Sequence, residues 1–247
     1  MKLKKILNYS PNFNFKKRKN DQIKFLIFHY TGMKKEKDSI NRLTSVKSKV
    51  SSHYLIKNNG DIVVLVPDLF IAWHAGKSYW KNFKFLNKNS IGIEISNPGH
   101  QYNYKKFSQK QIKSIIRLTK NLKQKYKINQ NNILGHSDIA PTRKKDPGEK
   151  FPWRFLAKKN IGIWHSLSEN NLKKNRLQNV NSKIEKIFIK NISKIGYKLY
   201  EPKDIKKKKF LTLLVKAFQR RFRQNLINGI IDKECFLISQ NLVKNQI

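Results

Sequence analysis

The sequence is poor in cysteine and in long apolar runs. Its single cysteine, Cys235, excludes a disulfide framework and a zinc site built from several thiolates. No apolar run approaches the roughly 20 residues that span a bilayer. Residues 1–11 begin with basic side chains but lack the apolar stretch of about 7 residues that a secretory signal needs. They also lack a cysteine for lipid attachment. We therefore expect no membrane span, and a cytoplasmic location rather than export to the cell envelope by an unrecognised route.

Acidic residues are also scarce. The 247 residues include 15 Asp and Glu against 54 Lys and Arg, which gives a formal charge of +39. Such a charge fits a polyanionic partner: nucleic acid, an acidic membrane surface or an anionic cell-wall polymer. It also fits a compositional bias, because lysine greatly outnumbers arginine, whereas proteins that read nucleic acids rely more on the bidentate contacts of arginine. We favour the compositional explanation and expect no specific nucleic-acid partner.

What the chain does contain is enough apolar material for a core, with 38% hydrophobic residues. Residues 23–29 and 90–96 are typical of strands, and residues 52–66 predict a β-hairpin that turns at Asn59-Gly60. Residues 108–126 have the apolar spacing of a helix, with Ser108 as a plausible N-cap. This mixture predicts an α/β fold.

The composition changes along the chain and predicts four parts. Residues 1–20 are polar and basic and suggest a flexible N-terminal arm, whereas residues 21–165 carry the α/β pattern. Residues 166–181 are rich in Asn and Lys and suggest a linker. Residues 182–247 return to helical apolar spacing and predict a small helical domain, near the lower size limit for independent folding.

Two histidines stand where strand-like segments end, which is where side chains become available to a site. His29 closes the first strand, and His136 follows a short apolar segment. Two imidazoles and one carboxylate form a typical catalytic zinc set, with the fourth position left for water. Asp146, placed between Lys145 and Pro147, is a candidate for the carboxylate.

Glu94 is an unusual residue for its position in an apolar strand. By alternation it shares one strand face with Gly92 and Ser96, whereas three isoleucines occupy the other face. A carboxylate in such a strand must be paired, shifted in pKa or functional, unless the strand face is open to solvent. The missing side chain at Gly92 favours an open space on this face, as a substrate cleft requires.

Short segments in a fixed order extend across residues 21–165. They are residues 28–31 (FHYT), 52–56 (SHYLI), 72–76 (AWHAG), 91–97 (IGIEISN), 135–141 (GHSDIAP) and 144–153 (KKDPGEKFPW). In content and order they resemble the type-2 zinc N-acetylmuramoyl-L-alanine amidases, which cleave bacterial peptidoglycan. The resemblance implies a mixed central β-sheet flanked by helices, with residues 21–165 as the catalytic domain. It also implies peptidoglycan or a muropeptide as the partner.

The resemblance also implies roles for individual residues. One Zn²⁺ per chain would be held by His29, His136 and Asp146. Glu94 would take a proton from water and pass it to the departing amine, and Lys144 would stabilise the oxyanion. Substrate contacts are expected from His74, Asn97 and Arg143.

The C-terminal region is similar to small peptidoglycan-binding modules around residues 215–234. Their usual acidic residue is Asn228 here, and a later glycine is Asp232. The region therefore either binds glycan or only packs on the catalytic domain. For the whole chain, the alternatives to an amidase are a non-catalytic peptidoglycan-binding module of the same fold and, from the charge alone, a polyanion-binding protein.

Overall fold

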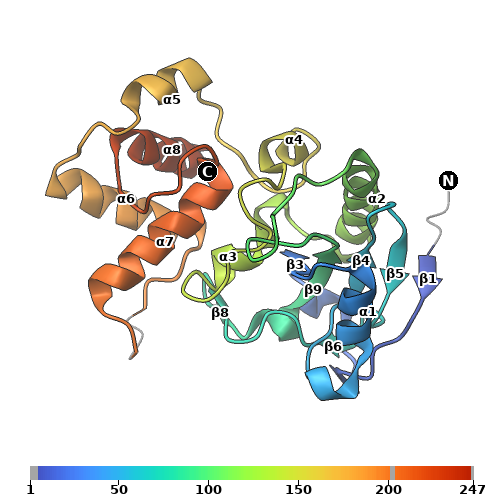
Figure 1. Cartoon of the computed structure of the whole chain (residues 1–247). Coiled ribbons are helices and arrows are strands. Elements are labelled where there is room, and N and C mark those ends of the chain that lie inside the picture. The colour runs from blue at the N-terminus through green and yellow to red at the C-terminus, as the bar shows by residue number, and fades with distance from the viewer. Residues whose placement is uncertain (1–4, 201–203, 246–247) are drawn as a thin grey trace.

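The computed structural model describes residues 5–200 and 204–245 and has a central six-stranded sheet of order β1-β5-β4-β9-β3-β10 (Figure 1). The sheet is mixed, because β4 and β5 form the antiparallel hairpin and the other neighbours run parallel. Its strands are β1 (Lys5–Leu7), β3 (Phe25–Tyr30), β4 (Tyr54–Ile56), β5 (Ile62–Val64), β9 (Ser90–Ile95) and β10 (Ile133–Gly135). Two small ribbons are formed by β2 (Phe13–Asn14) with β6 (Ile71–Ala72), and by β7 (Tyr79–Trp80) with β8 (Phe83–Lys84). The predicted α/β class and hairpin are confirmed.

The helices fall into two groups. Those of the sheet region are α1 (Glu36–Thr44), α2 (Gln109–Tyr126), α3 (His136–Ile139) and α4 (Trp153–Ala157). The others are α5 (Glu169–Asn175), α6 (Ser182–Ile195), α7 (Lys207–Phe222) and α8 (Lys233–Lys244), which gather on the left of Figure 1. We refer to residues 166–200 and 204–245 as the helical unit.

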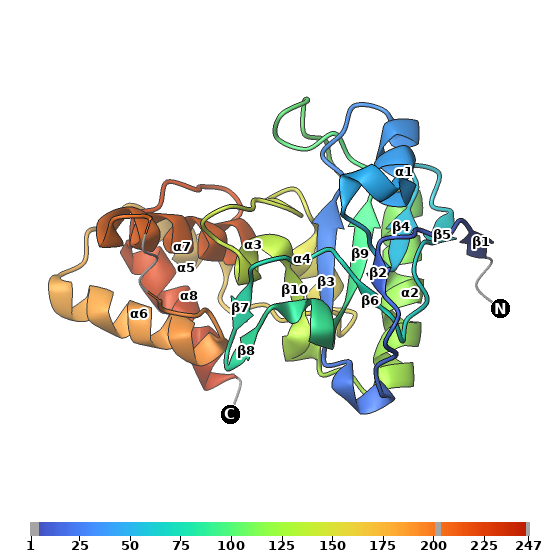
Figure 2. The same cartoon turned by 90° about the horizontal axis from the view of Figure 1, so that it is seen from below.

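Alternation along β3 divides the core between the two faces of the sheet. Leu26 and Phe28 point to one face and join the core beneath α2, whereas Phe25 and Ile27 point to the other face and join the core of the helical unit. Figure 2 shows the same arrangement, with α2 and the C-terminal helices on opposite sides of β3. The helical unit thus packs against one part of the sheet, and residues of both contribute to a single hydrophobic core.

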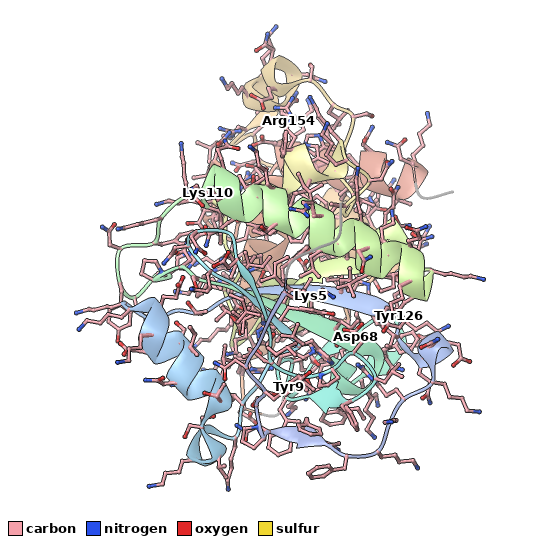
Figure 3. The ribbon with its side chains drawn as sticks, turned by 90° about the vertical axis from the view of Figure 1, so that its right-hand side faces the viewer. Lys5, Tyr9, Asp68, Lys110, Tyr126 and Arg154 are labelled. Atoms are coloured by element: carbon pink, nitrogen blue, oxygen red, sulfur yellow. The ribbon has the colours of Figure 1, made fainter. Side chains whose placement is uncertain are left out.

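Helix α2 covers the other face of the sheet and is fixed at its start as the sequence predicts. The Ser108 hydroxyl accepts the Gln111 amide N–H at 3.2 Å, and the Gln111 side chain accepts the Ser108 amide N–H at 3.0 Å. Near the other end of α2, Tyr126 and Tyr54 both donate hydrogen bonds to the buried Asp68, at 2.7 and 2.5 Å (Figure 3). This carboxylate ties the helix to the hairpin and to the loop that follows it.

The predicted flexible arm is wrong for residues 5–20, and residues 1–4 lie outside the described part of the chain. Strand β1 pairs in parallel with β5, and the chain continues along the sheet edge past Tyr9 (Figure 3). Arg18 is buried and donates to the carbonyls of Ser90 at 2.7 Å and Asp68 at 2.5 Å. Arg18 and Asn12 thus bond backbone carbonyls of distant segments, whereas the lysines around Arg18 are exposed.

The predicted linker is also a folded segment. Residues 169–175 form α5, which packs on α8, and Arg176 makes an ion pair with the buried Glu234 at 2.7 Å. Since this segment packs as the rest of the helical unit does, the unit begins earlier than residue 182. Residues 201–203 and 246–247 of the predicted helical domain lie outside the described residues.

Across residues 5–200 and 204–245, no helix combines the length and the apolar character that crossing a bilayer requires.

Candidate active site

A cleft of about 500 Å³ lies at the carboxyl ends of β3 and β9, on the sheet face opposite α2. Alternation places His29 on the same face as Phe25 and Ile27, but beyond the area that the helical unit covers. The walls come from α1, from the loops around Trp73 and His100, and from the segment that follows α3. The basic side chains among the lining residues are Arg42, Arg143, Lys144 and Lys145.

Three donor atoms meet in this cleft. His29 Nδ1 lies 2.9 Å from His136 Nδ1 and 3.1 Å from Asp146 Oδ2, and His136 Nδ1 lies 3.0 Å from the same carboxylate oxygen. Tetrahedral zinc with bonds of about 2.0–2.2 Å holds its ligand atoms roughly 3.3 Å apart. The residues predicted as metal ligands are therefore brought together from β3, α3 and the following loop as a cluster that can bind a metal ion.

The electrostatics of the cluster also suit a cation. Burial, followed by the neighbouring His136, lowers the pKa of His29 to about 4, so its ring is neutral near pH 7 and offers a lone pair. Burial alone would raise the pKa of Asp146, but His136 and His29 outweigh it, and its pKa lies well below the usual range. The ionised carboxylate of Asp146, beside the neutral ring of His29, places a negative charge in a buried part of the cleft.

Glu94 faces the same cleft from the adjacent strand, where it is the direct neighbour of His29 in the β3–β9 pairing. Its Oε2 atom is buried and has no hydrogen-bond partner among the described residues. Burial, followed by the charge of Asp146, raises the pKa of Glu94 to about 8. An orphaned carboxylate of this kind is typical of a proton acceptor for a molecule that enters the cleft.

The two predicted basic residues differ in their surroundings. Lys144 lines the cleft with a half-buried side chain. Arg143 also lines it, but its guanidinium donates to the carbonyls of Ala75 at 2.5 Å and Lys77 at 2.8 Å. Arg143 therefore fastens the loop after Trp73 to the segment that carries Asp146.

His74, predicted as a substrate contact, lies at the edge of the cleft with both ring nitrogens occupied. Its Nδ1 is 3.1 Å from His29 Nε2, and its Nε2 is 3.2 Å from Ser90 Oγ. Its ring fills the space over Gly92, where an added Cβ would meet His74 Cγ at 2.4 Å. The expectation of open space at Gly92 was wrong, since the missing side chain makes room for His74.

Asn97, also predicted to contact substrate, is buried in the loop beside the cleft. Its Nδ2 donates to Lys105 O at 2.8 Å, and its Oδ1 accepts the Gly99 amide N–H at 3.0 Å. These bonds shape the loop whose residues His100 and Gln101 line the cleft.

Sequence reasoning missed Ser90 and Asn87, which support His74. Ser90 lies on the same face of β9 as Gly92 and Glu94, so the alternation that singled out Glu94 could also have found it. Asn87 accepts the amide N–H groups of His74 and Ala75, at 3.1 and 2.7 Å, and no local pattern signals that contact.

Comparison with known proteins agrees with this geometry. Residues 19–149 match the family model described as N-acetylmuramoyl-L-alanine amidase, which is more than half of the chain. The chain belongs to the N-acetylmuramoyl-L-alanine amidase family. The protein is accordingly an amidase, a hydrolase of peptidoglycan amide bonds.

The whole amidase, including the helical unit, has relatives of similar length. AmiD of Escherichia coli is 34% identical over 90% of this chain and 83% of its own length. Its structure with the substrate anhydro-N-acetylmuramic acid-L-Ala-D-γ-Glu-L-Lys has a TM-score of 0.79, at 33% identity and coverage of 91% and 90%. AmpDh3 of Pseudomonas aeruginosa, solved with an anhydromuramic pentapeptide, has a TM-score of 0.78 at 29% identity, with 96% of this chain and 97% of that chain covered.

A third relative matches only part of the amidase. The 1,6-anhydro-N-acetylmuramyl-L-alanine amidase AmpD of Citrobacter freundii is 39% identical over 110 residues, which are 44% of this chain and 57% of that protein. The arrangement with a C-terminal helical unit is therefore shared with AmiD and AmpDh3.

Proposed function

We propose that the amidase hydrolyses the amide between the lactyl group of N-acetylmuramic acid and L-alanine, with one Zn²⁺ per chain. The observation that carries this proposal is the cluster of His29 Nδ1, His136 Nδ1 and Asp146 Oδ2 beside the orphaned carboxylate of Glu94. These nitrogen and oxygen donors fit zinc, which polarises a carbonyl and lowers the pKa of water to about 7. In this proposal His29, His136 and Asp146 hold the ion.

Glu94 acts as the proton carrier. Water adds its oxygen to the amide carbonyl carbon while Glu94 accepts a proton from that water. When the C–N bond breaks, Glu94 returns the proton to the departing amine of alanine, so the products are a lactyl carboxylate and a free peptide amine. Burial suits this carboxylate for the task, because its raised pKa of about 8 lies close to neutral pH.

Lys144 lies beside the reacting carbonyl in this proposal and stabilises the negative oxygen of the tetrahedral intermediate with its ammonium group. The other basic residues of the lining, Arg42 and Lys145, suit the free carboxylates of a peptide stem. His74, Asn97 and Arg143, proposed as substrate contacts from the sequence, have the internal bonds described above, so their contribution to substrate binding goes through the loops that they hold.

We infer that soluble anhydro-muropeptides are among the substrates. Support comes from the structures of AmiD and AmpDh3, which cover the full arrangement of this chain and were solved with anhydromuramic peptides. Such soluble fragments suit an enzyme of cell-wall recycling, and a cytoplasmic enzyme would meet only these fragments.

The test is mass spectrometry of products from intact sacculi and from soluble anhydro-muropeptides, with and without a chelator, alongside the zinc content of the purified chain. We expect one zinc per chain, release of L-alanyl peptides from the soluble substrate, and loss of turnover with the chelator. A chain that binds muropeptide without zinc and without turnover would be the non-catalytic binding module. Steeply salt-dependent DNA binding without muropeptide turnover would instead support a polyanion-binding protein.

A further inference from the structure

We propose that His74 is a positioning residue that orients the His29 imidazole in the metal centre. It does so through a chain of hydrogen bonds that runs from His29 through His74 and Ser90 to the carbonyl of Leu86. The proposal rests on the metal site proposed above and assigns His74 and Ser90 a function other than contact with substrate.

The chain of contacts is continuous and buried. His29 Nε2 lies 3.1 Å from His74 Nδ1, His74 Nε2 lies 3.2 Å from Ser90 Oγ, and Ser90 Oγ lies 2.6 Å from the carbonyl oxygen of Leu86. Ser90 is completely buried and His29 nearly so. Water therefore does not compete for these groups.

The direction of the chain follows from its fixed end. A carbonyl oxygen only accepts, so the Ser90 hydroxyl donates its one proton to Leu86 O. Ser90 Oγ must then accept the proton of His74 Nε2, which leaves the Nδ1 of a neutral His74 as an acceptor. His29 Nε2 donates to it, and the lone pair of His29 is left on Nδ1, the atom that faces His136 and Asp146.

The ring of His74 is held in one place by its surroundings. Asn87 Oδ1 accepts the amide N–H groups of His74 and Ala75. Gly92 leaves just enough room for the imidazole, because any Cβ at that position would overlap it at 2.4 Å. Its backbone is thus anchored, and a tilt of the ring would break its contacts with His29 and Ser90.

The same short segment also supports the second imidazole of the cluster. The carbonyl oxygen of Ala75, next to His74, lies 3.2 Å from His136 Nε2 and also accepts from Arg143. His136 therefore donates from Nε2 and keeps the lone pair of Nδ1 for the cluster. Residues 74–75 thus select the tautomer of both imidazoles, one through a side chain and the other through the backbone.

Outer partners of this kind change metal affinity by about 10- to 100-fold in other proteins when they are removed. The experiment measures the zinc dissociation constant by competition with a chelator, and kcat and KM for a soluble anhydro-muropeptide. His74→Leu keeps an apolar bulk but offers no acceptor, whereas the Oδ1 of His74→Asn can take the place of Nδ1. We expect His74→Leu to weaken zinc binding about 10- to 100-fold and His74→Asn to restore most of that loss.

The matched control is His165→Asn. His165 is as buried as His74, with 8% exposure against 9%, but it lies in the segment between α4 and α5 and contacts no residue of the cluster. Its variant should bind zinc as the natural chain does. If His74→Leu does not fold, Ser90→Ala tests the same chain of hydrogen bonds with a much smaller change. We expect Ser90→Ala to weaken zinc binding as well.

Two results would overturn the proposal. One is zinc affinity within about 2-fold of the natural chain in His74→Leu or, where that variant does not fold, in Ser90→Ala. The other is a raised KM in His74→Leu with zinc affinity unchanged, which is the behaviour of a substrate contact. Failure of the proposed function is a separate result, because the natural chain itself would then bind no zinc.

Discussion

Helix α3 and the loop after it present two buried aspartates to opposite surroundings. Asp146 faces the cleft, where its Oδ2 lies 3.0 and 3.1 Å from the two imidazoles of the cluster. Asp138 faces the helical unit and accepts hydrogen bonds from Arg221 at 2.5 Å, Tyr197 at 2.7 Å and the Gly135 amide at 2.8 Å. The protein supplies a guanidinium to Asp138 and two imidazoles to Asp146.

This difference separates the carboxylate that can bind a cation from the one that cannot. The charge of Asp138 is already balanced by a buried guanidinium, which also packs 4.1 Å from the centre of the Trp153 ring and donates to Ile133 O. Asp138 therefore ties α7 to the segment that bears His136. The helical unit in this way supports the segment that carries His136, whatever its affinity for glycan.

Removing Asp146 should have the largest effect on function. Asp146→Ala leaves two imidazoles without a charged ligand beside them, so we expect zinc binding to be lost at micromolar metal. Since metal catalysis is worth several kcal/mol, kcat/KM should fall at least about 1,000-fold. Zinc content and muropeptide turnover check this. A zinc-loaded, active Asp146→Ala variant would remove the contrast between the two aspartates.

Glu94→Gln should abolish proton transfer while sparing the ligands. We expect kcat to fall about 10²- to 10⁴-fold, the usual range for a general base. Zinc affinity should stay close to that of the natural chain. Turnover and chelator competition, measured on the same preparation, separate the two properties, and a parallel loss of zinc would show that Glu94 belongs with the ligands.

The same substitution should make the metal-free protein more stable at alkaline pH. The pKa of Glu94 is raised to about 8 in the folded chain, chiefly by burial, and lies near 4.5 when exposed. Between these values the unfolded chain releases the proton and the folded chain retains it, so stability falls as pH rises from about 4.5 to 8. Glu94→Gln removes this dependence. At about pH 8 its melting temperature should exceed that of the natural chain by at least 2–4 °C, which is the shift that about 1 kcal/mol produces in a chain of this length. At about pH 4 the two melting temperatures should match.

Asp138→Asn should act on stability. Breaking one side of a buried ion pair costs about 3–5 kcal/mol, because the other charge is left unpaired. At about 2–4 °C per kcal/mol, the melting temperature should fall by roughly 6–20 °C. Zinc affinity of the folded variant should stay within a few-fold of the natural chain. Calorimetry and chelator competition below the transition test this, and loss of zinc without loss of stability would reverse the roles assigned to the two aspartates.

The sequence predicts the parts of the molecule that depend on local pattern. Alternation and turn chemistry identify β3, β9 and the β4–β5 hairpin, and helical spacing with Ser108 identifies α2, because each of these is encoded within a few residues. His29 and His136 are foreseeable for the same reason, since they are reactive residue types at the ends of strands, and Asp146 follows His136 by only ten residues. No such pattern connects Asp138 with Arg221, which are 83 residues apart.

The failures of sequence reasoning concern polar side chains whose partners are far along the chain. Asn12 donates to the carbonyls of Ser45 and Val50, and Arg18 to that of Ser90, so a polar segment read as a flexible arm is fastened to the sheet. The resemblance implied a substrate contact for His74, and it gave no sign that the ring also bonds His29 and Ser90. Long-range hydrogen bonds of this kind leave no periodic signal.

Lys144→Met should have a smaller effect than either carboxylate substitution in the cleft. Loss of one oxyanion donor costs about 10²- to 10³-fold in a site without metal, and a shared role with zinc reduces this to about 10- to 100-fold in kcat. The half-buried ammonium group lies at the cleft surface, so stability and zinc affinity should not change. Steady-state kinetics with a soluble muropeptide test this. A change confined to KM would assign Lys144 to substrate binding.

Glu169→Gln should have the smallest effect, although this residue also joins the helical unit to the sheet region. Glu169 of α5 pairs with Arg154 of α4, but the two side chains are 51% and 50% exposed. Exposed pairs contribute about 0–1 kcal/mol, since water and salt screen the charges and both side chains lose freedom. The melting temperature should therefore fall by less than about 4 °C, against roughly 6–20 °C for Asp138→Asn. Both variants replace one carboxylate of an ion pair between the helical unit and the sheet region. An equal fall in melting temperature in the two variants would mean that the burial of the Arg221–Asp138 pair is not what joins these two parts.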